Sequence, residues 1–170
     1  IVLVDSNWGI GCNNKLLVRI KADMKRFSAL TTGHTVVTGR KNILSFPNEK
    51  PLDNRRHLVL SRNENFEREG IEVFHDVSSV LQKVKAIEEQ GEKVYLIGGA
   101  SVYEQLLPYC TYVEVTEVDK AFPCVDVYFP KLNEDERWEE VWRSETQEVE
   151  AKVPYTYHWV RYKNVNVETY

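Results

Sequence analysis

One carboxylate, Asp23, stands out because of the surface on which it is expected to lie. The apolar side chains around it have the spacing of one face of a helix: Ile20, Met24, Phe27 and Leu30. At about 100° per residue, Asp23 falls on that same face. A desolvated carboxylate without a partner is costly, which predicts a ligand-binding role. The alternative is that a first-turn Asp only complements the helix dipole.

Three β-rich segments end in residues that suit phosphate groups. The endings are Gly39-Arg40 after residues 35–38, Ser61-Arg62 after residues 57–60, and Gly98-Gly99 after residues 94–97. Glycines let the backbone approach an anion closely, and Arg binds phosphate with forked geometry. A diphosphate on the glycines and a further phosphate on Arg40, Ser61 and Arg62 would suit NADPH better than NADH. Each ending alone has an ordinary alternative, a tight turn for Gly-Gly and a solvated side chain for an isolated Arg.

The glycine fingerprint of dinucleotide-binding Rossmann domains is missing. Gly9-Ile10-Gly11 supplies only G-x-G, the third position of the motif is Asn14, and a loop rather than a helix is expected after it. A nucleotide cofactor must therefore be bound in a different way.

Length and composition are those of an ordinary globular chain. Its 170 residues suit one domain, residues 1–170, and 42% apolar with 28% charged residues is typical of such domains. The net charge of −4, without basic residues interleaved with aromatics, argues against a nucleic-acid partner. No segment has the length of a membrane span and no signal peptide is visible, so no membrane partner is expected.

The three cysteines, Cys12, Cys110 and Cys124, are far apart and odd in number. This pattern predicts neither a disulfide framework nor a zinc site. Each cysteine is interpreted as a small buried apolar residue, and a reducing cytoplasm is the simplest location. Cys12, in an expected loop, is the one candidate for reactivity.

The order of strand and helix signals predicts an α/β fold. β-rich segments are expected at residues 1–4, 35–38, 57–60, 71–74, 94–97 and 112–118, and helices at about 20–33, 77–91 and 100–107. Residues 5–15 and 47–55 are expected to be loops.

Two units within this order define the sheet. Residues 71–97 form strand, helix and strand, with Asp76 as N-cap, which is a right-handed crossover between parallel strands. Residues 141–148 and 155–162 are interpreted as an antiparallel hairpin around Val153-Pro154. The prediction is a single domain with a mostly parallel central β-sheet, flanking helices and an antiparallel C-terminal hairpin. Such a sheet binds ligands at the carboxyl ends of its strands.

Eight motifs follow one another in the order of a known family. They are Gly9-Ile10-Gly11, Ile20-x-x-Asp23-Met24-x-x-Phe27, Gly39-Arg40-Lys41, Pro51-Leu52-x-x-Arg55, Leu60-Ser61-Arg62, Ile97-Gly98-Gly99-x-x-Val102-Tyr103, Val115-Thr116 and Asp126-x-x-Phe129-Pro130. Along essentially its whole length, the chain resembles the dihydrofolate reductase family. The resemblance implies an oxidoreductase that transfers a hydride from NADPH to C6 of 7,8-dihydrofolate, with N5 protonated from water, to give 5,6,7,8-tetrahydrofolate. It also implies a monomeric, cytoplasmic protein without a metal.

The resemblance assigns roles residue by residue. Asp23 would pair with the 2-amino group and N3 of the pterin, and Thr116 would orient it. The substrate-binding residues would be Ile1, Val2, Met24, Phe27, Phe46, Leu52, Arg55 and Ile97, with Arg55 on the α-carboxylate of the glutamate tail. The cofactor-binding residues would be Leu3, Gly39, Arg40, Lys41, Asn42, Leu60, Ser61, Arg62, Gly98, Gly99, Ser101, Val102, Tyr103 and Gln105.

Three positions depart from the family pattern. Leu17-Val18 replaces a Pro-Trp pair whose indole N–H binds an ordered water near the carboxylate, so a wetter or differently packed site is expected. Asn42 stands where the family prefers a Thr that helps bind the diphosphate. Val127 replaces a frequent Thr, which is expected to change how its loop pairs with the loop at residues 12–16.

Two alternatives stay open beside this function. One is a pyrimidine reductase of riboflavin synthesis, which has the same fold and would keep the NADPH-binding strand ends without needing Asp23, Phe27 and Arg55 together. The other is a catalytically weakened homologue that only binds NADPH. The tryptophans, Trp8, Trp138, Trp142 and Trp159, are interpreted as packing or surface residues.

Overall fold

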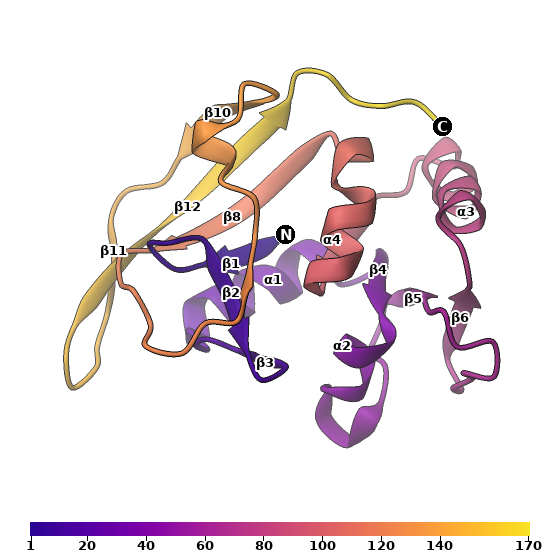
Figure 1. The fold of residues 1–170 in the computed structure, drawn as a ribbon, viewed down its shortest axis with the longest axis horizontal. Helices are drawn as coiled ribbons and strands as arrows, with labels where there is room; N and C mark the ends of the chain where they lie inside the picture. The colour runs from indigo at the N-terminus through magenta and orange to yellow at the C-terminus, as the bar shows by residue number, and fades with distance from the viewer. The chain divides into compact units, whose positions relative to one another are not determined.

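Backbone hydrogen bonds group the strands into three sheets, which belong to two units of the chain. The computed structural model describes all 170 residues (Figure 1). Unit 1 comprises residues 1–24 and 108–168, and unit 2 comprises residues 25–107 and 169–170. The predicted α/β class is confirmed, because strands and helices alternate along the chain. That all of it forms one domain stays a prediction.

Unit 2 contains a four-stranded sheet in which every pair of neighbouring strands is parallel. Its strands are β4 (Thr35–Gly39), β5 (Arg56–Leu60), β6 (Ile71–Phe74) and β7 (Val94–Gly98), in the order β6-β5-β4-β7. β4 is buried along its whole length and β5 in its middle, with Val36, Leu58 and Val59 at 0% exposure. Strands buried on both faces read as continuous apolar runs, which is why their positions could be predicted.

Three of the four α-helices lie where the sequence predicted helices, and α2 is additional. They are α1 (Lys21–Thr31), α2 (Arg40–Leu44), α3 (Val77–Glu89) and α4 (Ala100–Leu106), with single 3-10 turns η1 (Pro47–Glu49) and η2 (Leu107–Tyr109). Asp76 caps α3, since its carboxylate accepts from Ser79 N at 2.7 Å. The predicted crossover from β6 through α3 to β7 is confirmed, and it passes over the two strands between them.

Unit 1 contains a mixed sheet built on two long strands. Its strands are β1 (Val2–Val4), β8 (Tyr112–Val118), β10 (Trp138–Arg143), β11 (Gln147–Val149) and β12 (Tyr155–Asn164). β1 is parallel to β8, and β12 runs antiparallel beside β8 (Figure 1). Both β10 and β11 pair antiparallel with β12, which confirms the C-terminal hairpin. Its first arm is interrupted at residues 144–146 instead of running unbroken.

A small third sheet in unit 1 was not predicted. It consists of β2 (Gly9–Cys12), β3 (Lys15–Leu16) and β9 (Val127–Tyr128), in the order β3-β2-β9. The prediction that residues 5–15 are all loop was therefore wrong. Strands of two to four residues are too short to show a two-residue period. A 3-10 turn, η3 (Leu132–Glu134), follows β9.

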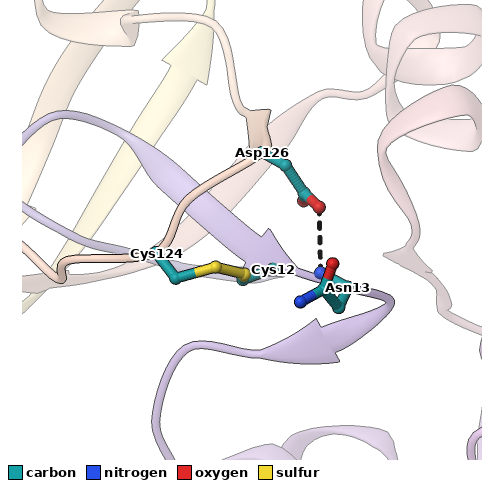
Figure 2. The surroundings of a disulfide bond; sticks show 4 residues. All are labelled: Cys12, Asn13, Cys124 and Asp126. Carbon is teal, nitrogen blue, oxygen red and sulfur yellow. Dashed lines mark hydrogen bonds between the residues drawn. A yellow bond between two sulfur atoms is a disulfide. The ribbon is translucent and has the colours of Figure 1, made fainter.

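The cysteines correct a further prediction. Cys12 and Cys124 form a disulfide with a Cα–Cα distance of 5.8 Å, and neither is buried (Figure 2). Beside it, Asn13 N donates to Asp126 Oδ2 at 2.9 Å. Cys110 is the free cysteine, and it is half-buried. The interpretation of Cys12 and Cys124 as unpaired, buried apolar residues was wrong, because a separation of 112 residues in sequence hides their proximity.

None of the helices combines the length and the apolar character that crossing a membrane requires. No group of three or more His, Cys, Asp or Glu side chains is arranged to hold a metal ion.

Candidate functional site

The carboxylate singled out in the sequence lies in the first turn of α1 and is half-buried. Thr116 on β8 donates its hydroxyl proton to Asp23 Oδ1 at 2.5 Å. This direct hydrogen bond agrees with the expectation that Thr116 orients Asp23. Because Thr116 is only 3% exposed, its hydroxyl has little freedom to rotate toward another partner.

A second donor to the same carboxylate was missed. Trp159 on β12 donates its indole N–H to Asp23 Oδ1 at 3.0 Å, so its interpretation as a packing or surface residue was wrong. Trp159 lies directly opposite Thr116 in the antiparallel pairing of β8 with β12. This register is the signal that identifies Trp159, and it cannot be obtained from the sequence without knowing how β12 pairs.

The indole that donates to Asp23 packs against an apolar cluster in unit 1. Its buried members are Ile20, Val118 and Tyr157, and Val18 and Trp159 pack against them. Burial, together with the negative charge of Asp23, raises the pKa of the Tyr157 phenol. The site is thus packed differently from the family pattern, since Val18 fills apolar space and the indole donor comes from β12.

The rest of α1 is less buried than its apolar spacing predicted. Met24 is 48% exposed, Phe27 and Leu30 are half-buried, and Thr31 is the one buried residue of the helix. The expected core-facing stripe was therefore wrong for Met24. An apolar side chain that stays accessible is suited to forming the wall of a ligand site.

In unit 2, the Arg55 guanidinium is held in place by α1 and by its own loop. Its Nη1 donates to Thr31 Oγ1 at 3.1 Å and its Nε donates to Asp53 O at 3.0 Å. Its Cζ lies 6.0 Å from the centre of the Phe27 ring, within the range of cation–π attraction. Burial lowers the pKa of Arg55, and the charge of Asp53 opposes this effect, but an arginine stays protonated at neutral pH.

His57, at the start of β5, holds the loop that carries Arg55. Its Nε2 accepts from Leu52 N at 3.1 Å, and its Nδ1 lies 3.1 Å from Arg55 O, to which it donates in the neutral tautomer. Phe46 approaches the imidazole edge-on, with ring centres 6.4 Å apart. The family resemblance assigns Leu52 and Arg55 to the substrate and gives no role to His57.

The three strand ends whose residues suit phosphate groups lie at one edge of the unit 2 sheet. Gly39 at the end of β4 pairs with Leu60 of β5, and Thr38 pairs with Gly98 of β7. Carboxyl ends of adjacent parallel strands lie together, as predicted. Ser61 is buried and Arg62 is exposed, which leaves the Arg62 guanidinium accessible to a ligand.

Two of these endings leave little room for a Cβ. Gly98 has φ +111°, and a Cβ there would come within 3.2 Å of the Tyr103 ring. A Cβ on Gly39 would lie 3.0 Å from Val102 Cγ2, so this glycine lets α4 pack close to β4. The Gly98-Gly99 peptide bond is cis.

Asn42 ties α2 to the neighbouring strands. Its side-chain amide donates to Thr38 Oγ1 at 2.8 Å and more weakly to Ile97 O at 3.4 Å. Thr38 in turn donates its hydroxyl proton to Gly98 O at 2.8 Å. Asn42 therefore fixes the shape of the strand ends, a role that the sequence did not predict.

The remaining predicted residues have varied surroundings. Val2 is buried, and Leu3 lies opposite Thr116 in the pairing of β1 with β8. Gln105 Nε2 donates to Ser101 Oγ at 3.1 Å. The other predicted residues divide by exposure: Ile1, Arg40, Leu60 and Ile97 are half-buried, Tyr103 is buried, and Lys41 is exposed.

Comparison with known proteins places these features in one family. The family model described as dihydrofolate reductase matches residues 1–164. The chain belongs to the dihydrofolate reductase family. A dihydrofolate reductase from Staphylococcus haemolyticus is 32% identical over 165 residues, covering 97% of this chain and 94% of the relative. One from Mycobacterium tuberculosis is 37% identical over 142 residues, covering 82% and 80%.

A solved structure supports the same assignment. Dihydrofolate reductase from Enterococcus faecalis, in complex with NADP(H) and RAB-propyl, superposes with a TM-score of 0.80 at 29% identity. The match covers 96% of this chain and 94% of that protein. The fold predicted from the order of motifs is therefore that of the dihydrofolate reductase family.

Proposed function

We propose that this protein catalyses the NADPH-dependent reduction of 7,8-dihydrofolate to 5,6,7,8-tetrahydrofolate. The observation that carries the proposal is the half-buried Asp23 carboxylate, held by two uncharged donors in a chain of the dihydrofolate reductase family. Such a carboxylate suits the edge of a pterin, which offers two N–H donors side by side. The Enterococcus faecalis relative, whose structure contains NADP(H), supports the choice of cofactor.

Asp23 acts by binding and by its charge. Both protein donors contact Oδ1, so Oδ2 has its lone pairs available for the 2-amino group and N3 of the pterin. Hydrogen bonds to an ionised acceptor are about twice as strong as those between neutral groups. The negative charge also stabilises the positive charge that develops on the ring as N5 takes a proton from water. Thr116 positions the carboxylate for these contacts.

The strand ends of unit 2 fit the phosphates of the cofactor. A Cβ added to Gly99 would meet no atom within 4 Å, so the backbone there is open to an anion. Arg40, Ser61 and Arg62 supply the charge and the hydroxyl for a further phosphate. NADPH, when bound, supplies the hydride, and this chain binds and orients it. The same assignment extends to Leu3, Gly39, Lys41, Asn42, Leu60, Gly98, Ser101, Val102, Tyr103 and Gln105.

Arg55 is suited to the glutamate tail of dihydrofolate. Its guanidinium is held from two sides by Thr31 and Asp53, which reduces the conformational freedom it loses when a ligand binds. A guanidinium pairs with a carboxylate in forked geometry. Ile1, Val2, Met24, Phe27, Phe46, Leu52 and Ile97 are assigned to apolar contacts with the substrate.

The test is turnover of dihydrofolate and NADPH, followed by the loss of NADPH absorbance, in the wild-type protein and in Asp23→Asn. Loss of the charge should lower kcat/KM at neutral pH by about 100-fold or more, since two charge-assisted hydrogen bonds weaken at once. The exposed Asp119→Asn is the matched control and should keep wild-type activity. A wild-type protein that binds NADPH without turnover would contradict the function, and full activity in Asp23→Asn would contradict the role of Asp23.

We also propose that the protein is a monomer in the cytoplasm, where soluble small molecules are its partners. Disulfides are rare in reducing compartments, so in this location we expect the paired Cys12 and Cys124 of the structure to be held as thiols by the cell's reductants. Alkylation in intact cells tests the proposal. Labelling of both cysteines supports it, and protection of both contradicts it; gel filtration at several concentrations tests the monomer.

A further inference from the structure

The indole of Trp159 makes a direct hydrogen bond to the carboxylate that we assign to the substrate. We propose that Trp159 is a positioning residue, which fixes the orientation of Asp23 and directs Oδ2 toward the ligand. The meaning of this role for catalysis rests on the proposed function. The hydrogen bond itself is observed, with 3.0 Å between Trp159 Nε1 and Asp23 Oδ1.

The geometry of the sheet places this donor. Leu3, Thr116 and Trp159 form one row across β1, β8 and β12, because Leu3 pairs with Thr116 and Thr116 pairs with Trp159. Directly opposite residues on neighbouring strands point to the same face of a sheet. Thr116 and Trp159 therefore approach Asp23 from one row, which explains why both contact the same oxygen.

The indole is held rigidly enough to position its partner. Its ring packs edge-on against Tyr157, with centres 5.5 Å apart, and it belongs to the apolar cluster around Ile20 and Val118. The backbone is fixed as well, since Trp159 N donates to Ser144 Oγ at 2.9 Å. The indole has a single N–H to donate, and this packing restricts the rotation of the ring that carries it.

Two donors on one oxygen have a consequence for ligand binding. A carboxylate oxygen offers about two lone-pair sites, and Thr116 with Trp159 supplies donors for both sites of Oδ1. Oδ2 is then the main acceptor for a ligand. Trp159 thus sets the direction of the acceptor.

The experiment compares Trp159→Phe with the matched control Trp142→Phe. Phe keeps an aromatic ring on the apolar cluster and removes only the N–H donor and part of the ring. Trp142 is 43% exposed on β10, and it packs on Arg161. We expect Trp159→Phe to raise the Kd of dihydrofolate about tenfold, the size of a lost hydrogen bond to a charged group, and to leave the Kd of NADPH within about twofold of wild type. Trp142→Phe should change neither.

The comparison of the two ligands separates positioning of Asp23 from a general loss of packing, because only dihydrofolate is assigned to this carboxylate. A Trp159→Phe variant that binds dihydrofolate as tightly as Trp142→Phe does overturns the proposal.

A spectroscopic test stands even if the protein does not reduce dihydrofolate. The indole ¹H–¹⁵N resonance of Trp159 is identified by its loss in Trp159→Phe. Asp23→Asn should move that resonance strongly and leave those of Trp8, Trp138 and Trp142 nearly unchanged. An unmoved Trp159 resonance overturns the hydrogen bond itself, whereas absent turnover in the wild-type protein contradicts only the proposed function.

Discussion

Asp23 and Arg55, the two charged side chains that we assign to the substrate, are each held by a buried threonine. Thr116 donates to Asp23 Oδ1, and Thr31 accepts from Arg55 Nη1. Thr31 can accept because its own hydroxyl proton goes to Phe27 O at 2.8 Å. Uncharged partners fix the two side chains without neutralising them, so both charges remain available to a ligand.

Arg62 is assigned to the phosphate that distinguishes NADPH from NADH. We expect Arg62→Ala to raise the Kd of NADPH about tenfold and the Kd of NADH less than about twofold, because only NADPH carries a phosphate for the guanidinium. Fluorescence titration with each cofactor measures both constants. Arg137→Ala, which removes an exposed arginine paired with Asp135 in unit 1, is the control and should change neither. Equal losses for both cofactors would contradict the assignment.

What the sequence could reveal differs from residue to residue. Asp23 could be singled out because a helical period places it among apolar side chains, and Thr116 followed from the order of motifs. Trp159 could not be found, because its role depends on which residue of β8 it faces. A shift of one residue in that register would turn the indole to the other face of the sheet.

Among the secondary-structure elements, the ends of the strands in the unit 2 sheet could be predicted from the pattern of apolar residues. The short strands and the loops could not. β4, β5 and β7 are apolar runs bounded by Gly or Ser, so their carboxyl ends could be located within a residue. β2 and β9 pair across a long sequence separation and are too short to have a period. The shape of the loop at residues 51–55 could not be predicted either, because it depends on the imidazole of His57.

The His57 ring makes this loop sensitive to acid. Burial is the main cause that lowers its pKa, the charge of Arg55 adds to the effect, and the hydrogen bond to Arg55 O opposes it. The unfolded chain therefore takes up a proton near pH 6.5, the ordinary value for His, while the folded chain resists it. Because the unfolded state binds more protons in that window, the free energy of unfolding falls as pH drops below about 6.5.

Replacement of His57 tests this pH dependence of the unfolding free energy. His57→Gln should flatten the decrease in unfolding free energy between about pH 6.5 and 5, measured by urea denaturation at a series of pH values. Glu72, whose pKa is lowered mainly by the hydrogen bond from Arg56, loses its contribution only near pH 4 and below, so the two windows separate. An unchanged slope in His57→Gln would show that His57 is not the group responsible.

In the whole chain, the Cys12–Cys124 disulfide joins two parts of unit 1 that are far apart in sequence, since the segment between the two cysteines includes all of residues 25–107. The two cysteines are 112 residues apart, and one lies at the end of β2 while the other precedes β9. Spacing alone could not predict the pair, since three cysteines allow several pairings or none. A crosslink that closes so long a loop restricts the unfolded chain far more than the folded one.

Removing the crosslink should therefore destabilise the protein. We expect Cys12→Ser with Cys124→Ser to lower the free energy of unfolding by about 2–4 kcal/mol, below the roughly 4.7 kcal/mol that chain entropy predicts for a 100-residue loop. For a chain of this size, each kcal/mol corresponds to a decrease of about 2–4 °C in Tm. A phosphine reductant should lower the Tm of the wild-type protein by as much as the double substitution does, and it should leave the Tm of the double variant unchanged. Cys110→Ser is the control and should respond to the reductant like wild type, whereas a reductant effect that persists in the double variant would rule out the Cys12–Cys124 bond as its source.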